Sequence, residues 1–297
     1  MYRIGIIGSD NSHAEIFSKL VNLPDEKTGA YRFPDLKVNI IFGLEEEQTR
    51  QVAEAGRIET IAKSPEEFFG KVDAVMVVFR HGDLHLPYAM PFVKAGIPTW
   101  IDKPFTIKTE DAAALIREAE QRGTLLTGGS TCRYIHDLTA LKNSIQNGSR
   151  IGKIRAAVMN FPATLENEYG GIYFYGAHLA EMAMEAFGYD AVSVVASENK
   201  GLVTAIVKYD EYQLTLNFIP GCKEYFAILY GENGTAFREL DITGCYIHGF
   251  VKFVEMLRSK SLPVPFKHFY APVELLNAIR ESYETGDEIY LTGVVNS

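Results

Sequence analysis

The sequence predicts an α/β protein with two parts: a doubly wound parallel sheet, then an α/β domain with a large, mainly antiparallel sheet. Up to about residue 122, short apolar runs alternate with helical patterns, which is typical of a parallel sheet flanked by helices. From Val192 to Phe237 apolar residues recur at every second position, as in an antiparallel sheet with one solvent-exposed face. We therefore expect domains at residues 1–122 and 123–297.

In the first part, strands are predicted at the apolar runs of residues 3–8, 36–42, 72–79 and 97–101, and near Leu125. Helical patterns lie between them, at residues 14–21, 45–55, 83–95 and 109–122. Ser64-Pro65 resembles a further helix start, Asp83 is a candidate cap, and Gly123 ends the last helix. The second part adds helices at residues 133–146, 173–187, 250–257 and 272–285, and a strand that opens at Ile151.

Composition excludes several classes of protein. The net charge of -9 and the pI of about 5.4 argue against nucleic acid, because phosphate-backbone binding needs a basic face. No stretch is apolar enough to cross a bilayer, and the N-terminus does not resemble a signal peptide. The three cysteines have no metal-ligand spacing and leave one unpaired in any disulfide scheme. We expect a cytoplasmic protein without a bound metal.

The stretch from Ile97 to Phe105 lies between the two sequence patterns, and it contains Asp102, Lys103 and Pro104. Pro104 biases Lys103 away from helical backbone, and the carboxyl ends of parallel strands line the ligand crevice. We therefore expect the Lys103 ammonium to face a cleft. The alternative is a strand that simply stops at a turn.

The first strand-to-helix turn reads Gly8-Ser9-Asp10-Asn11-Ser12-His13, where a dinucleotide-binding protein carries Gly-x-Gly-x-x-Gly. Only the first glycine is present, and Asp10 places a β-carbon and a negative charge where the backbone should approach a pyrophosphate. Ser12 and Glu15 have capping-box spacing, so the helix could satisfy its own amides. For His13 we expect a structural role.

The second strand of such a domain normally ends in an acid that holds the adenosine ribose. Here Glu45 is a displaced candidate, although Glu45, Glu46 and Glu47 also suit an exposed, acidic first helical turn. Three acids would repel a 2′-phosphate. We therefore expect NAD rather than NADP, bound weakly because of Asp10.

Several short segments follow one another at characteristic spacing. They are Val72-Asp-Ala-Val75 with His85, Ile101-Asp-Lys-Pro104, Arg133-Tyr134, Ile151-Gly-Lys-Ile-Arg155, Gly231-Glu-Asn-Gly-Thr235 and Ser282-Tyr-Glu-Thr-Gly286. In this order they resemble the Gfo/Idh/MocA family of oxidoreductases over almost the whole chain. The segment at Asp102 resembles the family's Glu-Lys-Pro signature, with aspartate in place of glutamate.

A further segment, Gly170-Gly-Ile-Tyr-Phe-Tyr-Gly176-Ala-His178, resembles the family's Gly-Gly segment followed by Asp-x-Gly-x-His. The resemblance implies that Lys103 and His178 lie at the catalytic centre. We expect His178 to remove the substrate's hydroxyl proton, Lys103 to hold its oxygen and Asp102 to position the lysine. The family's aspartate is replaced by Phe174 in this chain. Tyr175, three residues before His178 on one helical face, is our candidate for the missing hydrogen bond.

The resemblance also implies a set of cofactor contacts and a Rossmann-like first domain. The implied contacts are Gly8, Ser9, Asp10, Asn11, Ser12, Glu45, Phe79, Arg80, His85, Lys103 and Arg133. The implied activity is NAD-dependent oxidation or reduction of a polyol, sugar or related hydroxy compound, in a homo-oligomer. One alternative is a non-catalytic ligand-binding or regulatory protein on the same fold, and another is a lyase or hydrolase that uses a resident nicotinamide transiently.

Overall fold

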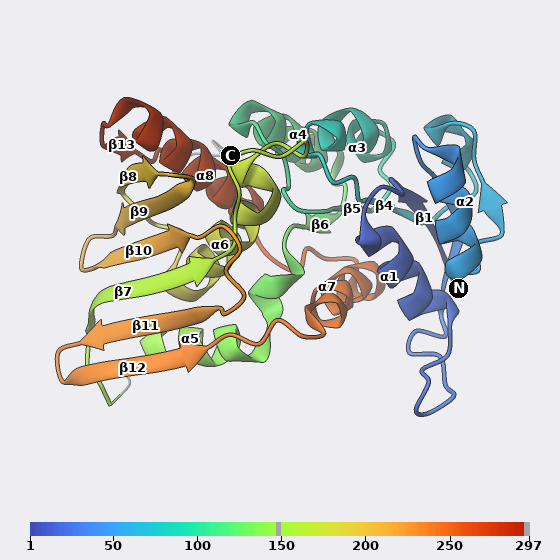
Figure 1. The fold of residues 1–297 in the computed structure, drawn as a ribbon. Coiled ribbons are helices and arrows are strands. Elements are labelled where there is room, and N and C mark those ends of the chain that lie inside the picture. Colours follow the sequence, from blue (N-terminus) through green and yellow to red (C-terminus); the bar gives the residue numbers. More distant parts are fainter. Residues whose placement is uncertain (147–149, 294–297) are drawn as a thin grey trace.

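The computed structural model describes residues 1–146 and 150–293, and it contains two sheets that lie side by side (Figure 1). The first sheet has the strand order β3-β2-β1-β4-β5-β6, and every described pair in it is parallel. Its strands are β1 (Tyr2–Ile7), β2 (Leu36–Phe42), β3 (Thr60–Ile61), β4 (Ala74–Val77), β5 (Thr99–Ile101) and β6 (Leu126–Gly128). This confirms the predicted doubly wound sheet. The short, exposed β3 was not predicted, because two residues carry no readable periodicity.

Helices lie between these strands in the order that the sequence predicts. They are α1 (Ser12–Asn22), α2 (Glu46–Ala55), α3 (His85–Lys94) and α4 (Thr109–Arg122), with short 3₁₀ turns η1 (Pro65–Phe68) and η2 (Gly82–Leu84). Two predicted caps are wrong. The cap of α1 is Asn11, one residue before Ser12, and Asp83 lies inside η2, where its N–H donates to the His81 ring. Both misplacements are one or two residues, the usual uncertainty of a helix end.

The second sheet has the order β12-β11-β7-β10-β9-β8-β13, and only the β7–β10 pair is parallel among the pairs described. Its strands are β7 (Ile154–Phe161), β8 (Ser193–Asn199), β9 (Leu202–Lys208), β10 (Gln213–Phe218), β11 (Phe226–Gly231), β12 (Gly234–Glu239) and β13 (Ile289–Tyr290). Helices α6 (Ile172–Phe187) and α8 (Lys267–Thr285) pack together on one face, and α5 (His136–Gln146) packs against α6. The mainly antiparallel second sheet is therefore confirmed.

Helix α7 (Cys245–Ser259) returns from the second sheet to the first, where it lies beside α1 (Figure 1). Phe250, Phe253 and Leu257 share a buried core with Ile4, Phe17 and other residues of the first sheet. The short turn η3 (Thr131–Tyr134) packs against the same helix. Helix α7 thus packs against elements of both parts of the chain. The domain boundary at residue 122 stays a prediction.

Candidate active site

A cavity of about 280 Å³ lies at the seam between the two sheets. Its walls come from the turn after β1, the segments after β4 and β5, η3, the start of α6 and the start of α7. The residues that line it include Asn11, Ser12, His13, Arg80, Lys103, Cys132, Phe174, Tyr175, His178, Cys245 and Tyr246. No aspartate or glutamate belongs to this lining, so in the part of the chain that the structure describes the cavity carries cationic and neutral groups only.

Lys103 follows directly on β5, whose parallel pairing with β4 continues to the Asp102 N–H, which donates to Val77 O at 2.9 Å. The lysine is almost completely buried, and its Nζ donates to the Phe174 carbonyl oxygen at 3.2 Å. Burial lowers the pKa of the Lys103 ammonium, and the nearby Asp102 carboxylate partly offsets this shift. The lysine thus faces a cleft, as the sequence predicted, and it touches the residue that replaces the family's aspartate.

Asp102 is fully buried, and it is not among the residues that line the cavity. Its Oδ2 lies 2.5 Å from His13 Nδ1 and accepts from Asn11 Nδ2 at 3.2 Å. Burial opposes ionisation, but His13 and Lys103 outweigh it, so the pKa of Asp102 lies below its usual value. Asp102 is therefore an anion that contacts His13 and is not a direct partner of substrate.

His178 lies in the second turn of α6, and its Nδ1 is 2.6 Å from Ser130 Oγ. Its Nε2 makes no hydrogen bond within the described residues, and the ring lines the cavity. Burial, together with the positive charge of Lys103, lowers the pKa of His178 well below its usual value. At neutral pH His178 is therefore an uncharged ring with one nitrogen on Ser130 and the other toward the cavity.

Tyr175 lies at the cavity without the hydrogen bond that its spacing predicted. Its hydroxyl makes no hydrogen bond to Lys103 or His178 in the described structure, and 44% of the residue is exposed. The ring centroid lies 5.4 Å from Lys103 Nζ, at the outer limit of a cation–π contact. Tyr175 covers the cavity mouth, and its predicted role in steadying Lys103 and His178 remains untested.

Arg133 lies outside the cavity although the family resemblance implies a cofactor contact. It is buried and binds Glu181, Glu185, Tyr189 and the carbonyl oxygen of His268. Glu181 also accepts the Ser130 N–H at 2.8 Å, and burial raises its pKa to about 7 in spite of Arg133. This buried network fixes Ser130, which in turn contacts His178. The position of Arg133 supports an indirect role.

The turn after β1 offers several unpaired donors. The N–H groups of Ser9, Asp10, Asn11 and Ser12 make no hydrogen bond within residues 1–146 and 150–293. Gly8 has φ of 106°, and a β-carbon there would lie 2.8 Å from Phe79 N, so glycine is required. Asp10 is turned toward the β4 side, where its Oδ2 accepts the Arg80 N–H at 3.1 Å. This arrangement suits an anion such as a pyrophosphate better than the sequence suggested.

A hollow of about 540 Å³ opens beyond this turn, at the end of β2. Its lining is Phe42, Gly43, Leu44, Glu46, Thr49, Arg50, Ile61, Ala62 and Lys63. Glu45, the predicted ribose ligand, is exposed and is not part of the lining. A hollow lined by apolar side chains and a few charged ones, next to free amides, fits the adenosine half of a dinucleotide. The residues present therefore fit the cofactor that the sequence predicted, with Glu46 nearer to the hollow than Glu45.

Phe79 and His85, two other predicted cofactor contacts, are fully buried. The His85 ring lies between the carbonyl oxygens of Phe79 (3.0 Å from Nε2) and Pro104 (2.7 Å from Nδ1), and burial lowers its pKa. These residues connect the segment after β4 to the segment after β5. They shape the walls of the seam, and neither lines the 280 Å³ cavity.

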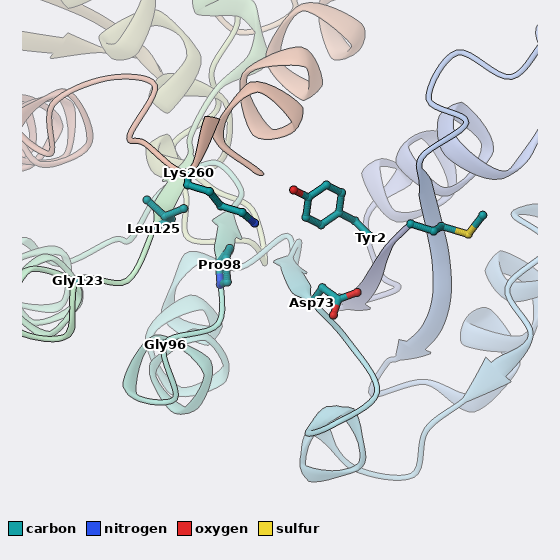
Figure 2. A pocket seen from close by; sticks show the side chains of 8 residues that line it. Tyr2, Asp73, Gly96, Pro98, Gly123, Leu125 and Lys260 are labelled. Carbon is teal, nitrogen blue, oxygen red and sulfur yellow. The ribbon is translucent and has the colours of Figure 1, made fainter. Parts of the chain in front are cut away.

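A larger hollow, of about 710 Å³, lies at the opposite edge of the first sheet (Figure 2). Tyr2, Pro98 and Lys260 line it at the amino ends of the strands, and Figure 2 shows Tyr2 and Lys260 directed toward each other. Ligands of open parallel sheets bind at the carboxyl ends instead. The smaller cavity at Lys103 is therefore the candidate active site.

Two features of the site were missed from the sequence. His13 was expected to be structural, yet it lines the cavity and contacts Asp102. Cys132 and Cys245 appear unrelated in sequence, yet both line the cavity, and the neighbouring Cys132 thiol lowers the pKa of Cys245 to about 7. The sequence carried one signal for the contact between His13 and Asp102. Histidine occupies the third glycine position of the turn, and residue 102 is aspartate where the family signature has glutamate.

Together, a doubly wound nucleotide-type sheet, free amides after β1 and a buried lysine at the seam define an α/β protein with a dinucleotide-type site. Residues 2–130 match the family GFO_IDH_MocA, described as an oxidoreductase family with an NAD-binding Rossmann fold. This match confirms the resemblance to the Gfo/Idh/MocA family over residues 2–130.

One curated relative is scyllo-inositol 2-dehydrogenase (NADP(+)) IolW of Bacillus subtilis, 25% identical over 244 residues. The alignment covers 77% of this chain and 62% of the relative, so the chain spans less than two thirds of that protein. Two solved structures share the fold. Myo-inositol dehydrogenase from Lactobacillus casei has a TM-score of 0.83 at 13% identity, covering 100% of this chain and 98% of its own. The enzyme from Corynebacterium glutamicum has a TM-score of 0.80 at 19% identity, covering 98% and 99%.

No helix in the described residues combines the length and apolar character that crossing a bilayer requires.

Proposed function

We propose that this chain is an NAD-dependent oxidoreductase that interconverts a hydroxyl and a carbonyl group on a polyol, sugar or related hydroxy compound. The observation that carries the proposal is the position of Lys103. Its ammonium is buried in a cavity that adjoins the free amides of a dinucleotide-type turn. The relatives named for inositol oxidation support the same substrate class.

The turn from Ser9 to Ser12 would hold the pyrophosphate of the dinucleotide through its amides. The hollow at the end of β2 would take the adenosine. The acids Glu45, Glu46 and Glu47 favour NAD, and Glu46 lines the hollow itself, whereas Arg50 and Lys63 of the lining are the groups that NADP would use. Bound NAD supplies the hydride acceptor that alcohol oxidation requires.

Within the cavity, the Lys103 ammonium would hold the substrate oxygen and stabilise negative charge that develops on it. His178 would contact the same hydroxyl through Nε2, the nitrogen that has no partner in the described structure. A cavity of about 280 Å³ lies at the small end of ligand pockets, which begin at about 300 Å³, so it suits a single-ring substrate. Phe161 and Tyr225 close the cavity on the side of the second sheet and exclude water.

The test begins with thermal unfolding of the purified protein in NAD and in NADP. At about a hundredfold excess over Kd, NAD should stabilise the protein by roughly 2.7 kcal/mol, with a smaller effect of NADP. A panel of polyols, sugars and sugar acids is then tested for NAD reduction. A protein that is stabilised by a polyol but reduces no NAD on the panel would instead be a ligand-binding or regulatory protein. No stabilisation by either dinucleotide would contradict the proposal.

We also propose a location in the cytoplasm, where the three free thiols would stay reduced.

We further propose a homo-oligomer that forms through the uncovered face of the second sheet, the face opposite helices α6 and α8. The uncovered face carries a row of side chains set by the strand register: Ile206, Thr215, Val158, Ile228 and Phe237. Four of these five are apolar, and Phe237 is 66% exposed. An exposed apolar row of this kind is typical of a protein interface.

A further inference from the structure

We propose that His13, oriented by Asp102, is the residue that removes the hydroxyl proton in this cavity. The inference deepens the proposed function and rests on it, because it names the proton acceptor of the same reaction. It differs from the prediction made from the sequence, which gave that role to His178 and a structural role to His13.

His13 is placed where its ring can reach a ligand. It follows Asn11, the cap of α1, and so lies in the first helical turn, which faces the seam. The ring lines the cavity together with Lys103 and His178. Its Nε2 has no hydrogen-bond partner in the described structure and is not sealed from the cavity. The nitrogen that a substrate hydroxyl would meet is therefore open.

The partner of the other nitrogen decides which nitrogen carries the proton. Asp102 Oδ2 lies 2.5 Å from Nδ1, and an ionised carboxylate accepts hydrogen bonds but cannot donate them. A neutral His13 ring must therefore carry its one hydrogen on Nδ1. Its lone pair is then on Nε2 and directed into the cavity, which is the tautomer that a general base needs.

His178 is less suited to this role. Its Nδ1 partner, Ser130 Oγ, already accepts the Cys132 N–H at 3.2 Å, and its own hydroxyl hydrogen remains to be donated. Donation to Nδ1 places the His178 hydrogen on Nε2, where it can hold a substrate oxygen but cannot take a proton. Positive charge on His178 is also disfavoured by burial and by Lys103, whereas His13 faces an anion.

The proton transfer is balanced within these residues. The O–H bond of the substrate breaks, an N–H bond forms at His13 Nε2, and the electron pair stays on the oxygen. Lys103 stabilises that oxygen, Asp102 stabilises the imidazolium, and bound NAD would accept the hydride that the carbon loses. Asn11 helps because its Nδ2 donates to Asp102 Oδ2 and its Oδ1 accepts the backbone N–H of His13, so one side chain holds both residues.

Several charged or titratable groups surround His13 and would affect its protonation. Asp102 and Lys103 approach from the end of β5, His178 from α6, and Cys245 and Tyr246 from the start of α7. The Tyr246 ring lies 5.0 Å from the imidazole centroid. Among these groups Asp102 alone is an anion in direct hydrogen-bond contact, so its substitution is the sharpest probe.

The first experiment reads the tautomer by nuclear magnetic resonance of the full chain labelled with ¹⁵N-histidine. We expect neutral His13 to carry its hydrogen on Nδ1, and we expect Asp102→Asn to weaken that preference. His136→Gln is the matched control, because His136 is exposed and lies outside the cavity. A neutral His13 with its hydrogen on Nε2 would overturn the proposal, and this measurement on the unsubstituted chain does not depend on how a variant folds.

The second experiment uses a substrate found in the polyol panel. His13→Gln should lower kcat by about a hundredfold or more and remove the acidic limb of the pH profile, with little change in NAD affinity. His178→Gln should lower kcat but keep that limb, and His136→Gln should match the unsubstituted chain. Loss of the limb in His178→Gln alone would assign the proton to His178 and overturn the proposal.

If the unsubstituted chain oxidises nothing on the panel, the proposed function fails, and His13 is judged by binding. A polyol that stabilises the chain should shift the His13 Nε2 resonance, and the shift should be absent in Asp102→Asn. An unchanged Nε2 resonance in the presence of a bound polyol would overturn the inference about His13.

Discussion

Lys103 Nζ lies 4.0 Å from the centroid of the Phe174 ring and donates to the Phe174 carbonyl oxygen at 3.2 Å. The residue that replaces the family's aspartate thus still contacts the lysine, through its backbone and the face of its ring. A ring face in a desolvated site contributes about 0.5–2 kcal/mol to holding a cation, but it accepts no proton. The position therefore keeps the attraction for Lys103 and loses a titratable group.

Restoring the carboxylate should be tolerated. Phe174 lies in the first turn of α6, where the helix dipole favours a negative charge, and the new carboxylate would raise the pKa of Lys103. We expect Phe174→Asp to hold or raise turnover and to shift the Lys103-dependent limb of the pH profile upward. Phe174→Leu, which keeps the carbonyl contact and removes the ring, is the control. A large loss of turnover in the aspartate variant with unchanged thermal stability would contradict this expectation.

Substitution of the central groups should separate chemistry from cofactor binding. Lys103→Ala and His178→Ala should each lower turnover by about a hundredfold or more, because each removes a group that contacts the reacting oxygen. NAD affinity, measured by calorimetry, should change little, since the free amides and the hollow at β2 are untouched. An active unsubstituted chain that keeps its rate in both variants would show that the reaction occurs elsewhere.

Asp10 should weaken NAD binding. Its Oδ1 is buried without a partner in the described residues, beside amides that would hold a pyrophosphate. We expect Asp10→Gly to tighten NAD binding by about tenfold, the order of one partly screened charge repulsion. Asp10→Asn removes the charge but keeps an acceptor for the Arg80 N–H, so it should gain at least as much. This gain in NAD affinity should shrink at high salt. A gain that stays the same at all salt concentrations would exclude the electrostatic explanation.

Glu181 should make stability depend on pH near neutrality. Burial raises its pKa from 4.5 to about 7, so the folded state holds the proton more tightly than the unfolded state. Its contribution is therefore present in full below about pH 4.5 and is lost as the pH rises through about 7, by up to roughly 3 kcal/mol. Glu181→Gln should remove this loss. Urea unfolding at pH 5 and at pH 8 gives the change in the free energy of unfolding for each protein. An equal change in the unsubstituted chain and in Glu181→Gln would contradict the prediction.

The uncovered face of the second sheet should mediate self-association. Phe237→Lys places a charge in the apolar row, and we expect it to lower the oligomeric state seen by sedimentation. Tyr31→Lys, on the exposed loop before β2, is the control and should change nothing. A monomeric unsubstituted chain, or an oligomer that Phe237→Lys leaves intact, would exclude this face as the interface.

Much of the fold was predictable because its signals are local. Thr109–Arg122 has an apolar face and a glycine stop, and α4 occupies those residues, with Gly123 in the left-handed conformation at φ of 65°. The run at residues 72–79 predicted a strand buried on both faces, and all four residues of β4 are buried. Elements without a local signal were missed: β3 and β13 have two residues each and form only because a partner strand is already in place.

The site divides in the same way. The sequence by itself determined the order of strands and helices, the seam at residues 97–105 and the candidates Lys103 and His178, because periodicity and motif spacing are properties of neighbouring residues. Only the tertiary structure decided that Arg133 is buried among acids, that Glu46 rather than Glu45 adjoins the hollow, and that His13 meets Asp102. His13 and Asp102 are 89 positions apart in the chain. Their contact exists because parallel strands bring the turns after β1 and β5 to one edge of the sheet, and no local pattern records that meeting.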